Sequence, residues 1–102
     1  MTWIDAGLTA DLLDGRTISI PVGRRVIAVA RSGEAYYAID DVCTHDGEPL
    51  TGGEIEGTEI ICPRHGARFC LRTGEALTPP AYEPVRVYET RIEAGRLWVR
   101  AD

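Results

Sequence analysis

Two short segments of the sequence carry side chains that can bind a metal. Each places one cysteine just ahead of one histidine, in Cys43-Thr44-His45 and in Cys62-Pro63-Arg64-His65. Both histidines of the chain and two of its three cysteines lie in these segments. Thiolates and imidazoles are ligands of zinc ions and of iron–sulfur clusters. Because two such pairs in the same order would rarely arise by chance, the sequence predicts a metal centre rather than four buried structural residues.

The order of these ligands bears on which metal they hold. Structural zinc sites usually pair cysteine with cysteine and histidine with histidine. Here each segment carries one of each type, and the C-x-H spacing of the first suits ligands that point at two different metal ions. Two cysteines on one iron and two histidines on the other form the ligand set of a Rieske [2Fe–2S] cluster. We therefore expect that cluster, with a zinc site as the alternative.

The segments that must position these ligands are predicted to be short β-strands. Helical periodicity is nearly absent, and the one candidate turn, at 8–13, is too short for a stable helix. The fold class is therefore all-β, a small sandwich or barrel that forms one domain over 1–102. Alternating apolar residues bounded by glycine and proline predict strands at 16–20, 25–30, 35–39, 58–61, 67–70, 85–92 and 96–99.

One long loop interrupts the strands at 40–57, where six acidic residues and four glycines show little apolar alternation. A loop of this length in a compact domain usually carries function or is disordered. Because this one opens with Cys43-Thr44-His45, it is predicted to be functional.

The charges are unevenly distributed along the chain. The formal net charge of −5 argues against binding to nucleic acid or to an anionic membrane surface. Seven acidic residues and no basic one lie in 40–59, whereas three arginines and no acidic residue lie in 64–72. Such segments usually form an ordinary solvated surface, and the alternative is a pair of opposite patches that orient a protein partner. The N-terminus lacks the basic and apolar regions of a signal peptide, so a cytoplasmic protein without a membrane anchor is expected.

The two ligand segments resemble those of the Rieske iron–sulfur domain, specifically of the small soluble Rieske ferredoxins that serve bacterial ring-hydroxylating dioxygenases. Beyond the two segments and the following Gly66, the resemblance extends through 69–74, 79–81 and the hairpin at 85–99. It implies three stacked antiparallel sheets with the cluster at the tip of two loops, at about 40–50 and 62–68.

The resemblance also implies a role for each ligand. Cys43 and Cys62 would bind the inner iron of one [2Fe–2S] cluster, and His45 and His65 would bind the outer iron. The loop that contains Pro79 and Pro80 would cover the cluster. Candidates for an apolar cover are Leu50, Pro63 and Pro80.

By this resemblance the chain is an electron carrier and not an enzyme. It would take single electrons from a flavin-dependent ferredoxin reductase and pass them to a terminal non-haem iron oxygenase, as a monomer that makes transient contacts. The alternatives are a redox-regulatory or assembly-linked Rieske protein, a protein like the small subunit of nitrite reductase, and a zinc-stabilised binding module. Cys70 is expected to lie in a sheet as a small apolar residue, with a fifth ligand or a redox thiol as alternatives.

The residues after the second histidine predict a low reduction potential. High-potential members of the family carry a serine and a tyrosine whose hydroxyls donate to the cluster, at positions where this chain has Ala67 and Phe69. Without these donors the reduced cluster is less stabilised. We expect a midpoint toward the low end of the Rieske range of about −150 to +300 mV, measured by redox titration. A midpoint above about +100 mV would contradict this prediction.

Overall fold

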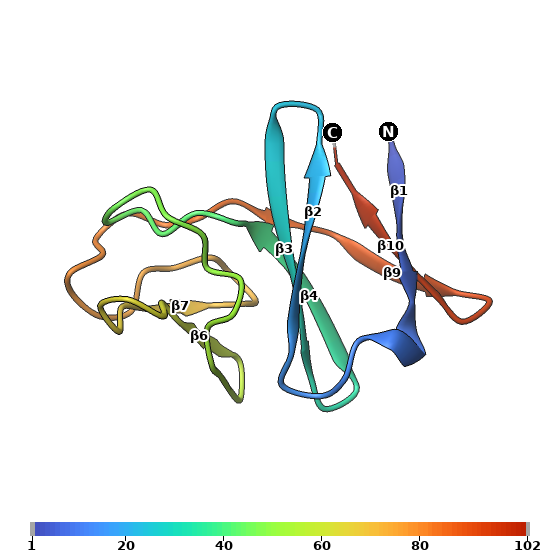
Figure 1. Ribbon diagram of the computed structural model, residues 1–102, viewed down its shortest axis with the longest axis horizontal. Helices are drawn as coiled ribbons and strands as arrows, with labels where there is room; N and C mark the ends of the chain where they lie inside the picture. Colours follow the sequence, from blue (N-terminus) through green and yellow to red (C-terminus); the bar gives the residue numbers. More distant parts are fainter. Residues whose placement is uncertain (1, 102) are drawn as a thin grey trace.

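The computed structural model describes residues 2–101, which form three antiparallel sheets and a short 3₁₀ helix, η1 (Thr9–Asp11). The sheets have the strand orders β1–β10–β9, β2–β3–β4–β8 and β5–β6–β7 (Figure 1). This confirms the predicted all-β class and the stacked antiparallel sheets. Within these residues no helix is both long and apolar enough to span a bilayer. The strands are β1 (Trp3–Leu8), β2 (Thr17–Val22), β3 (Arg25–Ser32), β4 (Ala35–Asp40), β5 (Ile55–Glu56), β6 (Glu59–Ile61), β7 (Arg68–Cys70), β8 (Val87–Tyr88), β9 (Thr90–Glu93) and β10 (Arg96–Arg100).

The sheet β2–β3–β4–β8 lies between the other two, because its strand β3 is buried on both faces. Ile27 and Val29 share one apolar core with side chains of β10. Ala28 and Ala30, which point to the opposite face, share a second core with side chains of β6 and β7. Strands buried on both sides read as continuous apolar runs rather than as alternating patterns. This double burial accounts for four of the five residues in the longest strongly apolar stretch of the sequence, 26–30, whereas Val26 is exposed.

Both hairpins that follow from turn residues in the sequence are present. Gly33, with a φ of +62°, lies in the turn between β3 and β4. Ala94 and Gly95 form the two-residue turn between β9 and β10, with φ angles of +53° and +74°. Positive φ at both central residues is the geometry that the right-handed twist of paired strands favours.

The predicted single strand at 85–92 is wrong, because the chain changes sheets at Glu89. Before this residue, β8 pairs with β4, and after it β9 pairs with β10. The Asp40 N–H donates to the carbonyl oxygen of Arg86 over 2.8 Å. The Arg100 N–H donates to the carbonyl oxygen of Glu89 over 2.9 Å. An alternating pattern does not record which sheet each part of it joins, so the two strands read as one.

Two strands were not predicted. In β1 the pairing with β10 shifts register between Asp5 and Leu8, where Gly7 has a φ of +102° and donates its N–H to Asp5 Oδ1 over 2.8 Å. This irregularity breaks the alternation that predicts a strand. Strand β5 lies inside the expected loop at 40–57, which is therefore shorter than predicted. The candidate turn at 8–13 contains η1.

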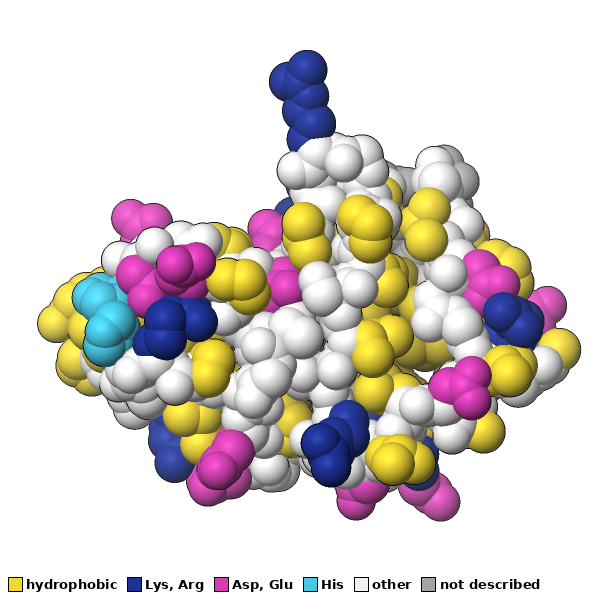
Figure 2. Space-filling view, viewed as in Figure 1, with side chains coloured by type: hydrophobic (Ala, Val, Ile, Leu, Met, Phe, Trp, Pro, Cys, Tyr) yellow, Lys and Arg dark blue, Asp and Glu magenta, His cyan; other side chains and the backbone are white. Residues whose placement is uncertain are grey.

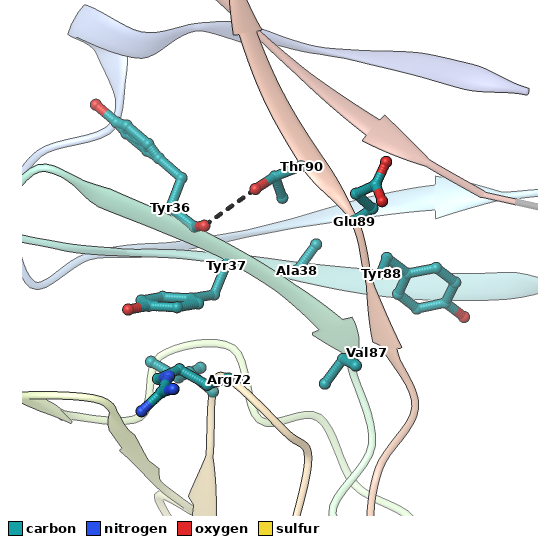
Figure 3. Close-up of a pocket in the computed structure, with 9 residues that line it drawn as sticks. Tyr36, Tyr37, Ala38, Arg72, Val87, Tyr88, Glu89 and Thr90 are labelled. Carbon is teal, nitrogen blue, oxygen red and sulfur yellow. Dashed lines mark hydrogen bonds between the residues drawn. The ribbon is translucent and has the colours of Figure 1, made fainter.

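An open groove of about 500 Å³ marks the place where the chain changes sheets. Its lining includes Tyr36 and Tyr37 of β4, together with Val87, Tyr88 and Thr90 from the crossing segment (Figure 3). The Thr90 hydroxyl donates to the carbonyl oxygen of Tyr36 over 3.2 Å. None of the four candidate ligands lines this groove, which belongs to the junction of the sheets.

The small sheet β5–β6–β7 adjoins the two loops that hold the candidate ligands. The first ligand loop, 41–51, follows β4, and the second ligand loop, 62–67, connects β6 and β7. Figure 1 shows this part of the chain at one end of the long axis, on the other side of the central sheet from β1 and β10. Figure 2 shows histidine side chains at the surface of the same end.

A close approach of two backbone segments behind these loops requires glycine at position 74. Gly74 has a φ of +82°, and an added Cβ would lie 2.0 Å from the carbonyl oxygen of Val85. The Gly74 N–H donates to the Cys70 carbonyl oxygen over 2.7 Å, and the Val85 N–H donates to the Gly74 carbonyl oxygen over 2.9 Å. The turn after β7 is thereby tied to the segment that leads into β8.

Gly74→Ala is expected to lower the free energy of unfolding by roughly 3 kcal/mol or more, because the backbone oxygen it meets cannot move aside as a flexible side chain would. Gly23→Ala is the matched control, since Gly23 has a φ of +63° but no atom within 4 Å of an added Cβ. Its expected cost is about 1 to 2 kcal/mol. Chemical denaturation measures both, and equal losses would contradict the close approach.

Candidate metal centre

The two ligand loops are closed by the same backbone hydrogen bonds. In each loop the N–H of the cysteine donates to the carbonyl oxygen five residues later. The bond from Cys43 to Glu48 and the bond from Cys62 to Ala67 both measure 2.7 Å. Each cysteine therefore starts a tight turn that brings the chain back beside the cysteine, and the two turns have the same hydrogen-bond pattern.

A glycine completes each turn at the same position. The N–H groups of Gly47 and Gly66, each four residues after a cysteine, donate to the carbonyl oxygens of Cys43 and Cys62 over 2.7 and 3.0 Å. Their φ angles are +76° and +74°, a region that side chains rarely adopt. The repeated spacing C-x₃-G was the sequence signal for these matched turns, and it was not used in the prediction.

The two cysteines place their thiols inside the protein. Cys43 is 0% exposed and Cys62 is 1% exposed, and both belong to the core that contains Phe69. Burial raises the pKa of the Cys43 thiol, and the adjacent Cys62 side chain raises it further, while backbone N–H groups of His45 and Asp46 act in the opposite direction. Two adjacent buried thiols can both ionise when a metal cation supplies the compensating charge.

The two histidines lie on the outside of the same site. His45 and His65 are exposed, with ring centroids 5.0 Å apart and ring planes at 87°. The four predicted ligands are thus divided into a buried thiol pair and an exposed imidazole pair, one of each from either loop. This division fits a cluster with two sulfur ligands on one iron and two nitrogen ligands on the other.

A carboxylate that the prediction omitted lies beside the imidazoles. Ligand atoms of His45, Asp46 and His65 lie within 4.8 Å of one another, with 3.4 Å between Asp46 Oδ2 and His65 Nδ1. Both oxygens of Asp46 already accept hydrogen bonds, Oδ1 from the Glu48 N–H over 3.0 Å and Oδ2 from Arg64 Nε over 3.2 Å. Asp46 is therefore engaged in holding the loops, and the Cys and His pairs remain the better donor set.

A second carboxylate that the sequence did not indicate anchors the first ligand loop from its buried side. Asp41 is largely buried, and its Oδ1 accepts the N–H groups of Leu50 and Thr51 over 2.7 and 2.8 Å. The Thr51 hydroxyl donates to Asp41 Oδ2 over 2.6 Å. These bonds join the two ends of the loop and so fix the segment between Asp41 and Leu50.

The three proposed cover residues have different environments. Leu50 is fully buried and packs in the core with both cysteines, so it supports the site from inside. Pro63 is exposed and Pro80 is half-buried. The segment after Pro80 is attached to the first ligand loop, because the Thr44 hydroxyl donates to the carbonyl oxygen of Glu83 over 2.7 Å.

The acidic and basic segments do not form two separate patches, because they pair with each other. Arg64 forms an ion pair with Asp46 at 3.2 Å. Arg68 forms ion pairs with Glu56 at 2.9 Å and with Glu59 at 3.2 Å. Two of the three arginines in 64–72 are thus neutralised by acidic residues of 40–59, which sequence order alone did not reveal.

Cys70 differs from its expected apolar role. It is half-buried on β7, while its neighbour Phe69 points into the core with Cys43 and Cys62. Successive side chains of a strand point to opposite faces, so Cys70 faces away from that core. A hydrogen bond from the Thr73 hydroxyl, with backbone N–H groups of Arg72 and Thr73, lowers the pKa of the Cys70 thiol.

The lowered pKa predicts that Cys70 forms a thiolate at lower pH than an ordinary cysteine. Alkylation by iodoacetamide, followed on the Cys70 peptide by mass spectrometry, should reach half its maximal rate at a correspondingly lower pH. Thr73→Val should move this midpoint upward, and Thr73→Ser, which keeps the hydroxyl, should not. Identical profiles for the Val variant and the unchanged protein would contradict the hydrogen bond.

Comparison with known proteins places this arrangement in a family. The model of the Rieske [2Fe–2S] domain matches residues 2–89. The chain is 34% identical over 100 residues to the ferredoxin component of the naphthalene 1,2-dioxygenase/salicylate 5-hydroxylase systems of Ralstonia sp, covering 98% of this chain and 96% of the relative.

Solved structures agree with this match over the same extent. The ferredoxin of carbazole 1,9a-dioxygenase from Nocardioides aromaticivorans IC177 is 29% identical, with a TM-score of 0.94 and full coverage of both chains. A chain from the complex of reduced oxygenase and oxidised ferredoxin in carbazole 1,9a-dioxygenase is 33% identical, with a TM-score of 0.89 and coverage of 95% of this chain and 91% of that one. Sequence, ligand loops and sheet arrangement all lead to one conclusion, that the chain belongs to the Rieske [2Fe–2S] domain family.

Proposed function

We propose that this chain is an electron carrier that passes single electrons to a terminal non-haem iron oxygenase. The observation that carries the proposal is the pair of matched loops, which set a buried thiol pair behind an exposed imidazole pair. Support comes from relatives that are ferredoxin components of dioxygenase systems, and from a similar chain solved in a complex of oxygenase and ferredoxin. The Rieske [2Fe–2S] cluster supplies the one-electron chemistry when it is bound.

Within this proposal, Cys43 and Cys62 bind one iron, and His45 and His65 bind the other. The burial of the two thiols keeps water from the sulfur side of the site. The exposed imidazoles bring the other side to the protein surface, where a partner can approach it closely. Two neutral imidazoles in place of two thiolates also leave the site with less negative charge, which favours the uptake of an electron.

The surroundings of the second ligand loop support a potential at the low end of the family's range. Ala67 and Phe69 are both fully buried in the core that contains Cys43 and Cys62. Neither side chain carries a hydroxyl group, so neither donates a hydrogen bond toward the ligands. A carrier of low potential is suited to reducing an oxygenase.

The finer parts of the proposal concern the electron donor and the state of the carrier. We infer that the donor is a flavin-dependent ferredoxin reductase, and that the chain works as a monomer in the cytoplasm, where thiols stay reduced. The exposed histidines lie together at one end of the long axis (Figure 2). Because reductase and oxygenase would both need this end, the carrier would visit them in turn through small, transient contacts.

Substitution of Cys62 and of Cys70 tests the ligand assignment. Cys62→Ser is expected to reduce the cluster content of the purified protein roughly tenfold or more, because it removes a metal-binding thiolate. Cys70→Ser is the matched control and should keep the cluster. Iron and sulfide analysis, the absorption spectrum and the EPR spectrum of the reduced protein measure the result.

Two outcomes would contradict the ligand assignment. One is a colourless protein that contains stoichiometric zinc, which would favour a zinc-stabilised binding module. The other is loss of the cluster in Cys70→Ser but not in Cys62→Ser. Reduction by a flavin-dependent reductase without electron delivery to a reconstituted oxygenase would instead favour a redox-regulatory Rieske protein.

A further inference from the structure

One side chain of the second ligand loop reaches across to the first. Arg64 lies between Cys62 and His65 in the sequence, and its guanidinium group makes two hydrogen bonds to the opposite loop. Nε donates to Asp46 Oδ2 over 3.2 Å, and Nη2 donates to the carbonyl oxygen of Pro49 over 2.8 Å. Because the acceptors are three residues apart in the first loop, a forked cation can engage both of them and fix the spacing of the two loops.

The acceptor on the first loop is itself held in place. Asp46 Oδ1 accepts the N–H of Glu48 over 3.0 Å, which closes a local turn, so the other oxygen is left to face Arg64. The side chain of Asp46 is 19% exposed and that of Arg64 is 35% exposed. An ion pair at this level of exposure is weak when it is isolated, but here it is reinforced by the bond to a backbone carbonyl.

The same guanidinium group touches a proposed ligand. Arg64 Nη2 lies 3.7 Å from the sulfur of Cys62, within reach of an N–H donor to sulfur. A positive charge at this distance stabilises negative charge on the ligand sulfur. Reduction adds one electron to the site, which the reductase would supply. The arginine keeps its proton and its positive charge throughout, because guanidinium groups are not deprotonated in proteins.

We propose that Arg64 is a positioning residue that clasps the two ligand loops together and keeps a positive charge beside the Cys62 sulfur, which raises the reduction potential of the cluster. The proposal rests on the ligand assignment given under the proposed function. Under this proposal the positive charge of Arg64 raises the reduction potential, whereas the absence of hydroxyl groups at Ala67 and Phe69 lowers it. The clasp and the charge are separate effects of one side chain, and different substitutions distinguish them.

Three variants of the full chain separate these effects. Arg64→Gln removes both the charge and the fork, and should give a lower midpoint potential with cluster loss roughly three- to tenfold faster in the presence of a chelator. Arg64→Lys keeps the charge but not the fork, so its potential should stay closer to that of the unchanged protein while its cluster is lost faster. Asp46→Asn removes the ion-pair partner, and should speed cluster loss while raising the potential.

Arg72→Gln is the matched control, because it removes an equal charge from an exposed arginine outside both ligand loops. Redox titration followed by EPR gives the potential, and the decay of visible absorbance with a chelator gives the rate of cluster loss. Equal potentials in Arg64→Gln and Arg72→Gln would overturn the charge effect. Unchanged rates of cluster loss in both Arg64→Lys and Asp46→Asn would overturn the clasp.

Measurements on the unchanged protein distinguish failure of this proposal from failure of the ligand assignment on which it rests. If it shows no Rieske spectrum, the ligand assignment fails, whatever the variants do. If it shows that spectrum and Arg64→Gln does not assemble a cluster, Asp46→Asn decides both effects. Unchanged cluster loss in Asp46→Asn would overturn the clasp, and a midpoint potential that does not rise would overturn the charge effect. A Rieske spectrum with variant potentials in the order Arg64→Gln, Arg64→Lys, Asp46→Asn, from lowest to highest, would support the role of Arg64.

Discussion

Two thiols that are buried and two imidazoles that stay at the surface set the constraint on which the rest of this structure depends. Only one residue separates Cys43 from His45, and only two separate Cys62 from His65, yet each pair spans the distance from core to solvent. Both loops make that passage in a tight turn. Glycine at one fixed position allows the turn in both loops, and the backbone bonds that close it are the same.

The metal centre and the hydrophobic core cannot be treated as separate parts of this small protein. The sulfur side of the site belongs to the same core as Phe69 and the inner residues of β3, and β3 also faces the second core. A chain of 102 residues buries little apolar surface, so a cluster held by both loops, as proposed, would contribute to folding as well as to redox chemistry. Loss of the cluster would therefore remove support from the central sheet.

Local patterns in the sequence were sufficient for the candidate ligands and for the fold class. The cysteine and histidine pairs and the two glycine-containing hairpin turns each lie within a few residues, so their meaning does not depend on the rest of the chain. The change of sheet at Glu89 depends on pairing with two distant strands, and alternation cannot show it. The pairing of Arg64 with Asp46 was missed for the same reason, since this contact spans the two loops.

The pairing of β1 with β10 has a practical consequence. The Ala101 N–H donates to the carbonyl oxygen of Thr2 over 2.9 Å, so both ends of the described chain leave the fold side by side (Figure 1). The central sheet separates them from the histidines. A protein immobilised on an electrode through either end would present its imidazoles to the solution rather than to the electrode surface. Voltammetry of such a film would then test whether soluble partners reach the cluster from the imidazole side, as proposed for the reductase and the oxygenase.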